Sequence, residues 1–209
     1  MLLKYGLLGL AYLLGSIPFS IILGVKLRGI DIRKYGSKNP GGTNSVRFLG
    51  KKIGFTIMFL DGLKAGLIVL LVKYGVFGDV DLLHPLAYGV AAAFGHVYSI
   101  YIKFKGGKAV ATTVGMSIAF NIYYALIMMV VFFIVLRIWK YVSVSSSSAA
   151  LTGAIIGLVV GFTSGVWDIA LFYGILLLLI LYRHKGNFQN IKNNVEPKVT
   201  VFDKKSKLV

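Results

Sequence analysis

The chain alternates between long apolar runs and shorter polar segments that are rich in lysine, arginine and glycine. A helix needs about 20 apolar residues to cross the hydrocarbon core of a membrane. Runs of suitable length and composition lie at 2–25, 53–72, 82–102, 109–139, 145–162 and 167–182. This pattern predicts an all-α, polytopic integral membrane protein.

The run at 109–139 is too long for one span. As a single helix its 31 residues would rise about 46 Å, whereas the hydrocarbon core is about 30 Å thick. The pair Phe120-Asn121 interrupts the run. We therefore expect a short helix over 109–119 and a full one over 122–139, which gives about seven transmembrane helices.

The distribution of basic residues orients these spans. With the N-terminus outside and the C-terminus inside, the inner segments hold 20 of the 23 lysines and arginines. Lysine and arginine accumulate in cytoplasmic loops, so the charges favour seven spans over six. The inner segments are 26–52, 103–108, 137–144 and 183–209.

Composition narrows the classes of partner. The 209 residues are 57% hydrophobic and carry a net charge of +16. No basic groove interleaved with exposed aromatics is visible, so we expect no nucleic acid. The basic face should instead attract membrane lipids and phosphorylated substrates. The chain has no cysteine and its three histidines lie on different segments, so neither a disulfide nor a metal centre is expected.

The first inner segment contains the stretch YGSKNPGGTNSVR at 35–47. Its glycines let the backbone approach a ligand, and successive N–H groups can form an anion-binding nest. Ser37, Thr43 and Asn44 add neutral donors, and Arg47 can bind a phosphate through two hydrogen bonds. The stretch predicts a phosphate-binding loop, although an ordinary turn-rich connector is the alternative.

The second inner segment places Gly106-Gly107-Lys108 directly before the expected short helix. This order directs backbone amides, a helix N-terminus and a lysine toward an anion. The alternative is a positively charged anchor at the membrane edge, which is the interpretation we give Lys103.

The remaining polar positions are more ambiguous. Serines at 143–148 are candidates for helix caps. His184 is either a general base or a hydrogen-bonding residue. Asp61 and Lys64 lie three residues apart inside the second span, where charges usually face the bundle interior. Either a structural ion pair or a functional role would explain them.

At these motifs the chain resembles the acyl-phosphate-dependent glycerol-3-phosphate acyltransferases of bacterial phospholipid synthesis. The resemblance reaches about residue 190 and comprises several separate motifs in the expected order, which makes it specific. The matching stretches are 14–18, 36–44, 49–52, 60–64, 95–96, 104–112 and 182–184.

The resemblance implies one transmembrane acyltransferase domain at 1–190, followed by a polar, loosely ordered cytoplasmic tail at 191–209. It implies a multi-pass protein of the bacterial inner (plasma) membrane with its active site facing the cytoplasm. The reaction would move an acyl group from acyl phosphate to the 1-hydroxyl of glycerol 3-phosphate. The products would be lysophosphatidic acid and phosphate, with no cofactor.

The resemblance also assigns residues. Ser37, Arg47 and Lys108 would bind glycerol 3-phosphate, and His184 and Asn187 would orient its glycerol part. The remaining substrate-binding positions would be Asn39, Gly41, Gly42, Thr43, Asn44, Gly106, Gly107 and either Ser143 or Ser146. The chain departs from the family pattern with Lys38 for glycine, Gly42 for alanine and Gly186 for glutamate.

Two other functions remain open. A transporter of organic phosphates would also use broken helices and helix ends that bind anions, but the sequence shows no internal repeat. A lipid-binding scaffold would not need two glycine-rich phosphate loops. A covalent acyl-enzyme is not expected, because no serine lies in a nucleophile elbow.

Overall fold

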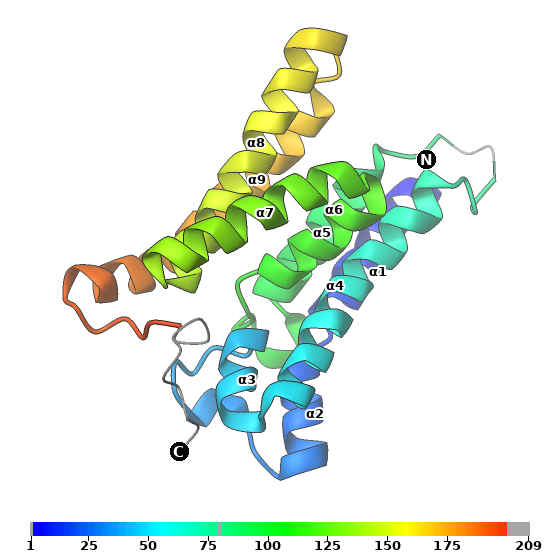
Figure 1. Ribbon diagram of the computed structural model, residues 1–209. Coiled ribbons are helices and arrows are strands. Elements are labelled where there is room, and N and C mark those ends of the chain that lie inside the picture. Colours follow the sequence, from blue (N-terminus) through cyan, green and yellow to red (C-terminus); the bar gives the residue numbers. More distant parts are fainter. Residues whose placement is uncertain (1, 79–80, 200–209) are drawn as a thin grey trace. The chain divides into compact units, whose positions relative to one another are not determined.

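The computed structural model describes residues 2–78 and 81–199, and all regular structure in these ranges is helical, as the hydrophobic pattern predicted (Figure 1). Two short 3-10 helices, η1 and η2, span Ile32–Lys34 and Ile100–Ile102. The α-helices are α1 (Leu2–Ser16), α2 (Phe19–Arg28), α3 (Gly42–Leu49), α4 (Lys51–Lys73), α5 (Pro85–Val97), α6 (Val110–Phe120), α7 (Ile122–Trp139), α8 (Val142–Ser164) and α9 (Asp168–Lys192).

Within these described ranges, five helical stretches are long and apolar enough to cross a membrane, counting α1 and α2 as one. The third predicted span is shorter than expected, because α5 has 13 residues before the chain turns into η2. The helix α6 has 11 residues, as expected for a short helix. The seven-span count and its orientation stay predictions.

Two of the apolar runs are broken. The first is interrupted at Ile17-Pro18, between α1 and α2, because proline has no N–H to donate and its ring disrupts the preceding turn. The break predicted at Phe120-Asn121 is confirmed, since α6 ends at Phe120 and Asn121 is extended with φ −154°.

The serines near the start of α8 are not its caps. The helix begins at Val142, three residues before the predicted start, and Tyr141 is the N-cap residue without a side-chain cap. The Ser145 hydroxyl donates to the Tyr141 carbonyl at 2.8 Å. A serine inside a helix can bond in this way to the carbonyl four residues back.

Contacts divide the chain into two compact units, Met1–Ile122 and Tyr123–Val209. In the first unit, α4 packs along α6 and α1 packs along α5 (Figure 1). Glycines allow both contacts: a Cβ at Gly115 would meet the backbone of Gly62, and one at Gly95 would meet that of Tyr12. Small residues of this kind let helix backbones approach closely in membranes.

In the second unit, α8 and α9 form a hairpin across a short turn at Gly165. Gly157 lies against Ala170, and Gly153 lies against Tyr173 and Met128. These contacts place α7, α8 and α9 in one unit.

The C-terminal segment is more ordered than predicted. The helix α9 continues ten residues beyond the expected end at Tyr182 and stops at Lys192. The chain then folds back, and the Val199 N–H donates to the Lys140 carbonyl at 2.8 Å. Polar contacts hold this segment, and the pattern of apolar residues gives no information about such contacts. The rest of the predicted tail, 200–209, lies outside the described residues.

Candidate active site

One buried side chain sets the shape of the first glycine-rich loop. The Asn44 amide Nδ2 donates to the Tyr35 carbonyl at 3.0 Å and more weakly to the Ile32 carbonyl at 3.4 Å. Its Oδ1 accepts the Ser37 N–H at 3.3 Å. Asn44 was predicted to offer a donor to a ligand, but its side chain is instead engaged in ordering the loop.

Gly36 makes this arrangement possible. Its φ is 55°, a conformation that glycine adopts without steric cost. A Cβ at this position would also meet the Phe48 ring and the Asn44 amide oxygen. A larger residue would therefore displace the group that orders the loop.

A helix replaces the second half of the predicted nest. The helix α3 begins at Gly42, and its first hydrogen bond runs from the Ser45 N–H to the Gly41 carbonyl at 3.1 Å. The amides of Gly42, Thr43 and Asn44 belong to the first turn, whose N–H groups have no acceptor within the helix. A helix N-terminus of this kind attracts anions. The loop can therefore still bind a phosphate, through the first turn of a helix rather than through a nest.

The chain has glycine at position 42 where the family pattern has alanine, and the packing of this position explains the difference. A Cβ there would meet the Met58 side chain, including its Cε at 2.9 Å. Met58 of α4 thus occupies the space that an alanine at this position would need.

The basic residues near this loop differ in how their charge is used. Arg33 pairs with Asp31 at 2.7 Å, and its guanidinium holds the pKa of that carboxyl below its ordinary value. Arg47 is exposed on α3 and forms no ion pair with any residue in 2–78 or 81–199. Arg47 is therefore the better candidate for a phosphate ligand.

The second glycine-rich motif is held against the end of α5. The Gly106 N–H donates to the Val97 carbonyl at 2.9 Å, and the Gly107 N–H donates to the His96 carbonyl at 3.0 Å. Both amides are thus engaged within the protein. Of this motif, the half-buried Lys108 stays the predicted ligand for an anion.

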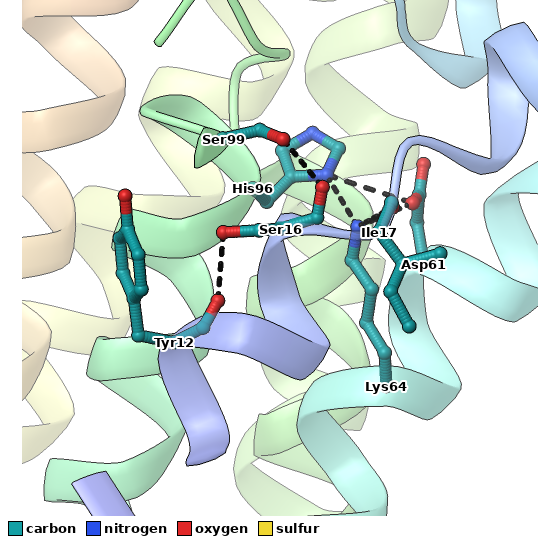
Figure 2. Close-up of polar contacts among 7 residues, drawn as sticks. All are labelled: Tyr12, Ser16, Ile17, Asp61, Lys64, His96 and Ser99. Carbon is teal, nitrogen blue, oxygen red and sulfur yellow. Dashed lines mark hydrogen bonds and ion pairs between the residues drawn. The ribbon is translucent and has the colours of Figure 1, made fainter. Parts of the chain in front are cut away.

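A buried ionic cluster lies beside this motif, formed by Asp61, Lys64 and His96 (Figure 2). The Lys64 ammonium is 2.8 Å from Asp61 Oδ1 and 3.0 Å from His96 Nδ1. Its third contact is the Ile17 carbonyl at the break between α1 and α2, at 3.0 Å. The acid–lysine pair was visible in the sequence, whereas the contact with His96 has no local signal.

In the second unit, His184 is buried on α9 with Nδ1 2.9 Å from the Ile180 carbonyl. A carbonyl oxygen only accepts, so Nδ1 carries a proton in this contact. In a neutral imidazole with this contact, Nε2 is the nitrogen that accepts.

Asn187 is held by a residue that no sequence motif marked. Its Nδ2 donates to Glu196 Oε1 at 2.6 Å, and Asn190 donates to the other carboxylate oxygen at 3.3 Å. The family pattern has a glutamate where this chain has Gly186. Here a carboxylate reaches Asn187 from the segment that follows α9.

The serine run of α8 also separates into two groups. Ser145 uses its hydroxyl on the helix backbone. The buried hydroxyls of Ser143, Ser146 and Ser147 have no hydrogen-bond partner among the described residues. An unsatisfied buried polar group costs about 1–3 kcal/mol, so a ligand contact would account for Ser143 or Ser146.

Apolar membrane-spanning helices and a helix N-terminus beside basic side chains define a helical membrane protein suited to phosphate-bearing ligands. Comparison with known proteins identifies the family. The profile of the glycerol-3-phosphate acyltransferase family matches residues 5–194, and the chain belongs to that family.

Relatives match over almost their full length. Glycerol-3-phosphate acyltransferase 3 of Bacillus anthracis is 44% identical over 207 residues, covering 99% of this chain and 100% of the relative. Glycerol-3-phosphate acyltransferase of Geobacillus kaustophilus is 44% identical and covers 91% of this chain and 93% of its own.

Two crystal structures of PlsY (YgiH), an integral membrane glycerol 3-phosphate acyltransferase, have the same fold. Its glycerol 3-phosphate form has a TM-score of 0.82 and 34% identity, covering 94% of this chain and 95% of that one. Its lysophosphatidic acid form has a TM-score of 0.79 and 35% identity, covering 93% and 94%.

Proposed function

We propose that this protein transfers a fatty acyl group from acyl phosphate to the 1-hydroxyl of glycerol 3-phosphate. The products are lysophosphatidic acid and inorganic phosphate, as in an early step of phospholipid synthesis. The family supports acylation of glycerol 3-phosphate. The observation that carries the proposal is the α3 N-terminus, which starts within the glycine-rich loop and precedes Arg47, a residue without an ion pair in the described part of the chain.

In this proposal two groups of residues bind the phosphate groups of the substrates. Ser37, Arg47 and Lys108 hold the phosphate of glycerol 3-phosphate, because two cations and a hydroxyl complement its charge. The phosphate of acyl phosphate lies at the α3 N-terminus, where the first-turn amides donate to it. The residues assigned to that second phosphate are Asn39, Gly41, Gly42, Thr43 and Asn44.

Other residues are assigned to orienting the glycerol part. His184 Nε2 accepts a hydrogen bond from a substrate hydroxyl, which agrees with the Nδ1 contact to Ile180. Asn187 and either Ser143 or Ser146 add further polar contacts. Gly106 and Gly107 act by fixing Lys108 rather than by touching the anion.

The reaction needs no nucleophilic side chain, because acyl phosphate is a mixed anhydride and already activated. The 1-hydroxyl oxygen bonds to the acyl carbon, the bond from that carbon to the phosphate oxygen breaks, and the hydroxyl proton passes to a phosphate oxygen. Holding the two substrates together lowers the entropic part of the barrier. Cations and amides stabilise the charge that develops.

We further propose that the protein has seven spans in the bacterial inner membrane, with the N-terminus outside. The inner basic segments then bring the phosphate-binding loops to the cytoplasmic side, where polar phosphate esters are accessible. The basic face also contacts anionic lipid headgroups.

The proposed reaction is tested by incubating purified protein with acyl phosphate and glycerol 3-phosphate. Phosphate release should depend on both substrates and match the lysophosphatidic acid formed. Acyl-CoA and acylated carrier protein are alternative donors that should not replace acyl phosphate. The Lys108→Ala variant should lose activity by two or more orders of magnitude.

Other outcomes are informative. Phosphate release that does not need glycerol 3-phosphate would reject the acyltransferase. Uptake of glycerol 3-phosphate into sealed vesicles would favour the transporter. Unchanged turnover in Lys108→Ala would refute the role of that lysine.

A further inference from the structure

The cluster of Asp61, Lys64 and His96 is almost fully buried, with exposed fractions of 2%, 6% and 8%. The proposed reaction uses none of these side chains. A buried ion pair is often no more stabilising than apolar residues of similar volume. Stability alone therefore does not explain why charged groups occupy this place.

Contacts within the cluster engage the Nδ1 atom of His96. The Lys64 ammonium has three protons and three acceptors, namely Asp61 Oδ1 at 2.8 Å, His96 Nδ1 at 3.0 Å and the Ile17 carbonyl at 3.0 Å. An ammonium only donates, so in its contact with Lys64 the His96 Nδ1 accepts, and Asp61 Oδ1 lies 3.5 Å from the same nitrogen. Figure 2 shows this imidazole nitrogen facing both the Lys64 ammonium and the Asp61 carboxylate.

The opposite side of His96 faces the second glycine-rich motif. Its carbonyl accepts the Gly107 N–H at 3.0 Å. A Cβ on Gly107 would meet ring atoms of the same histidine, with Cε1 at 2.9 Å. Both the backbone and the ring of His96 thus form the surface on which Gly107 lies, and Lys108 follows immediately.

We propose that Asp61, Lys64 and His96 are positioning residues that hold Gly106 and Gly107 on the end of α5 and so place Lys108. This inference rests on the proposed function, in which Lys108 binds the phosphate of glycerol 3-phosphate. The cluster acts through packing, because the pocket that it lines with Pro40, Gly106 and Gly107 has a volume of about 10 Å3. That volume accommodates about one water molecule.

Substitution of His96 should act on one substrate. His96→Leu keeps the volume but removes the acceptor for Lys64. It should raise KM for glycerol 3-phosphate about tenfold, with a smaller change in kcat and none in KM for acyl phosphate. His96→Asn retains an acceptor near the position of Nδ1 and should restore part of the affinity. If the cluster had only a structural role, the His96 substitutions would reduce the amount of folded protein without changing KM for one substrate more than for the other.

The two glycines supply a matched comparison. Gly107→Ala should raise KM for glycerol 3-phosphate in the otherwise wild-type protein, because the new Cβ meets the His96 ring. In a His96→Ala background the same substitution should change KM little further. A Cβ on Gly106 meets the carbonyls of His96 and Val97, which are backbone atoms. Gly106→Ala should therefore remain harmful in both backgrounds. Equal behaviour of the two glycines would overturn the inference.

Deuterium uptake separates failure of this inference from failure of the proposed function, since it needs no acyl donor. The His96→Leu variant should exchange faster in a peptide covering 97–109, while peptides from α8 and α9 stay unchanged. If the wild-type protein had no transferase activity, the proposed function would be rejected. Deuterium exchange would then still test whether the cluster holds the 97–109 segment. Active wild-type protein with unchanged exchange, or with unchanged KM in both His96 variants, would overturn the positioning role.

Discussion

Lys38 adopts a backbone conformation that suits glycine better than lysine. Its φ is 57°, and a side chain in this left-handed region costs roughly 1–2 kcal/mol. Lys38→Gly should therefore raise the thermal unfolding midpoint relative to Lys38→Ala, which removes the charge but keeps the strain. The expected difference is about 1 kcal/mol in unfolding free energy, measured in detergent. Equal midpoints would show that the loop has relaxed around Lys38.

His184 allows a test between a general base and an orienting group. Its Nδ1 contacts the Ile180 carbonyl at 2.9 Å. If His184 orients a hydroxyl, replacement by Ala, Asn and Gln should reduce kcat/KM to different extents. The remaining activity of these variants should keep the pH dependence of the wild-type protein. A general base would instead cause similar, large losses in kcat and remove one limb of the pH profile. Near-normal turnover of His184→Gln would exclude a histidine base.

Sequence motifs point to single residues but not to the contacts between them. Arg47 and Lys108 were singled out by neighbouring glycines and by charge. The engagement of Asn44 with Tyr35, and of Lys64 with His96 across 32 positions, follows from tertiary packing. No pattern in one segment reveals such partners, because several polar side chains could satisfy each group.

At the scale of elements, apolar periodicity located helices but not their ends. The helix α3 was hidden because its first turn has the glycines and polar residues of a loop. The extension of α9 beyond Tyr182 was missed because a helix need not end where the apolar residues end. Hydrogen bonds from Asn187 and Asn190 to Glu196 hold the segment that follows.

Glu196 should therefore matter although it lies outside every motif. Glu196→Gln removes the charge that accepts from Asn187 and Asn190, so the segment 193–199 should exchange deuterium faster. If Asn187 orients the substrate, kcat/KM should fall severalfold. Asn190→Ala removes only the longer contact of 3.3 Å and serves as the matched control. Equal effects of the two substitutions would argue against a role of Glu196 in holding Asn187.

At the scale of the whole molecule, the absence of cysteine makes topology directly measurable. Tyr74 and Lys192 are exposed and lie on opposite sides in the seven-span arrangement. A membrane-impermeant maleimide should label Tyr74→Cys in intact cells and Lys192→Cys only after lysis. Labelling of both in intact cells would support six spans, with 109–139 crossing once.

The Asp61–Lys64 pair also bears on how the chain enters the bilayer. The two charges lie within one helix at 2.8 Å, so they can neutralise each other as soon as α4 forms. His96 is synthesised later, since translation proceeds from the N-terminus. Asp61 therefore offers Lys64 a counter-ion before α5 has been synthesised, and the same ion pair persists in the folded protein. A lone lysine at this depth would resist insertion during that interval.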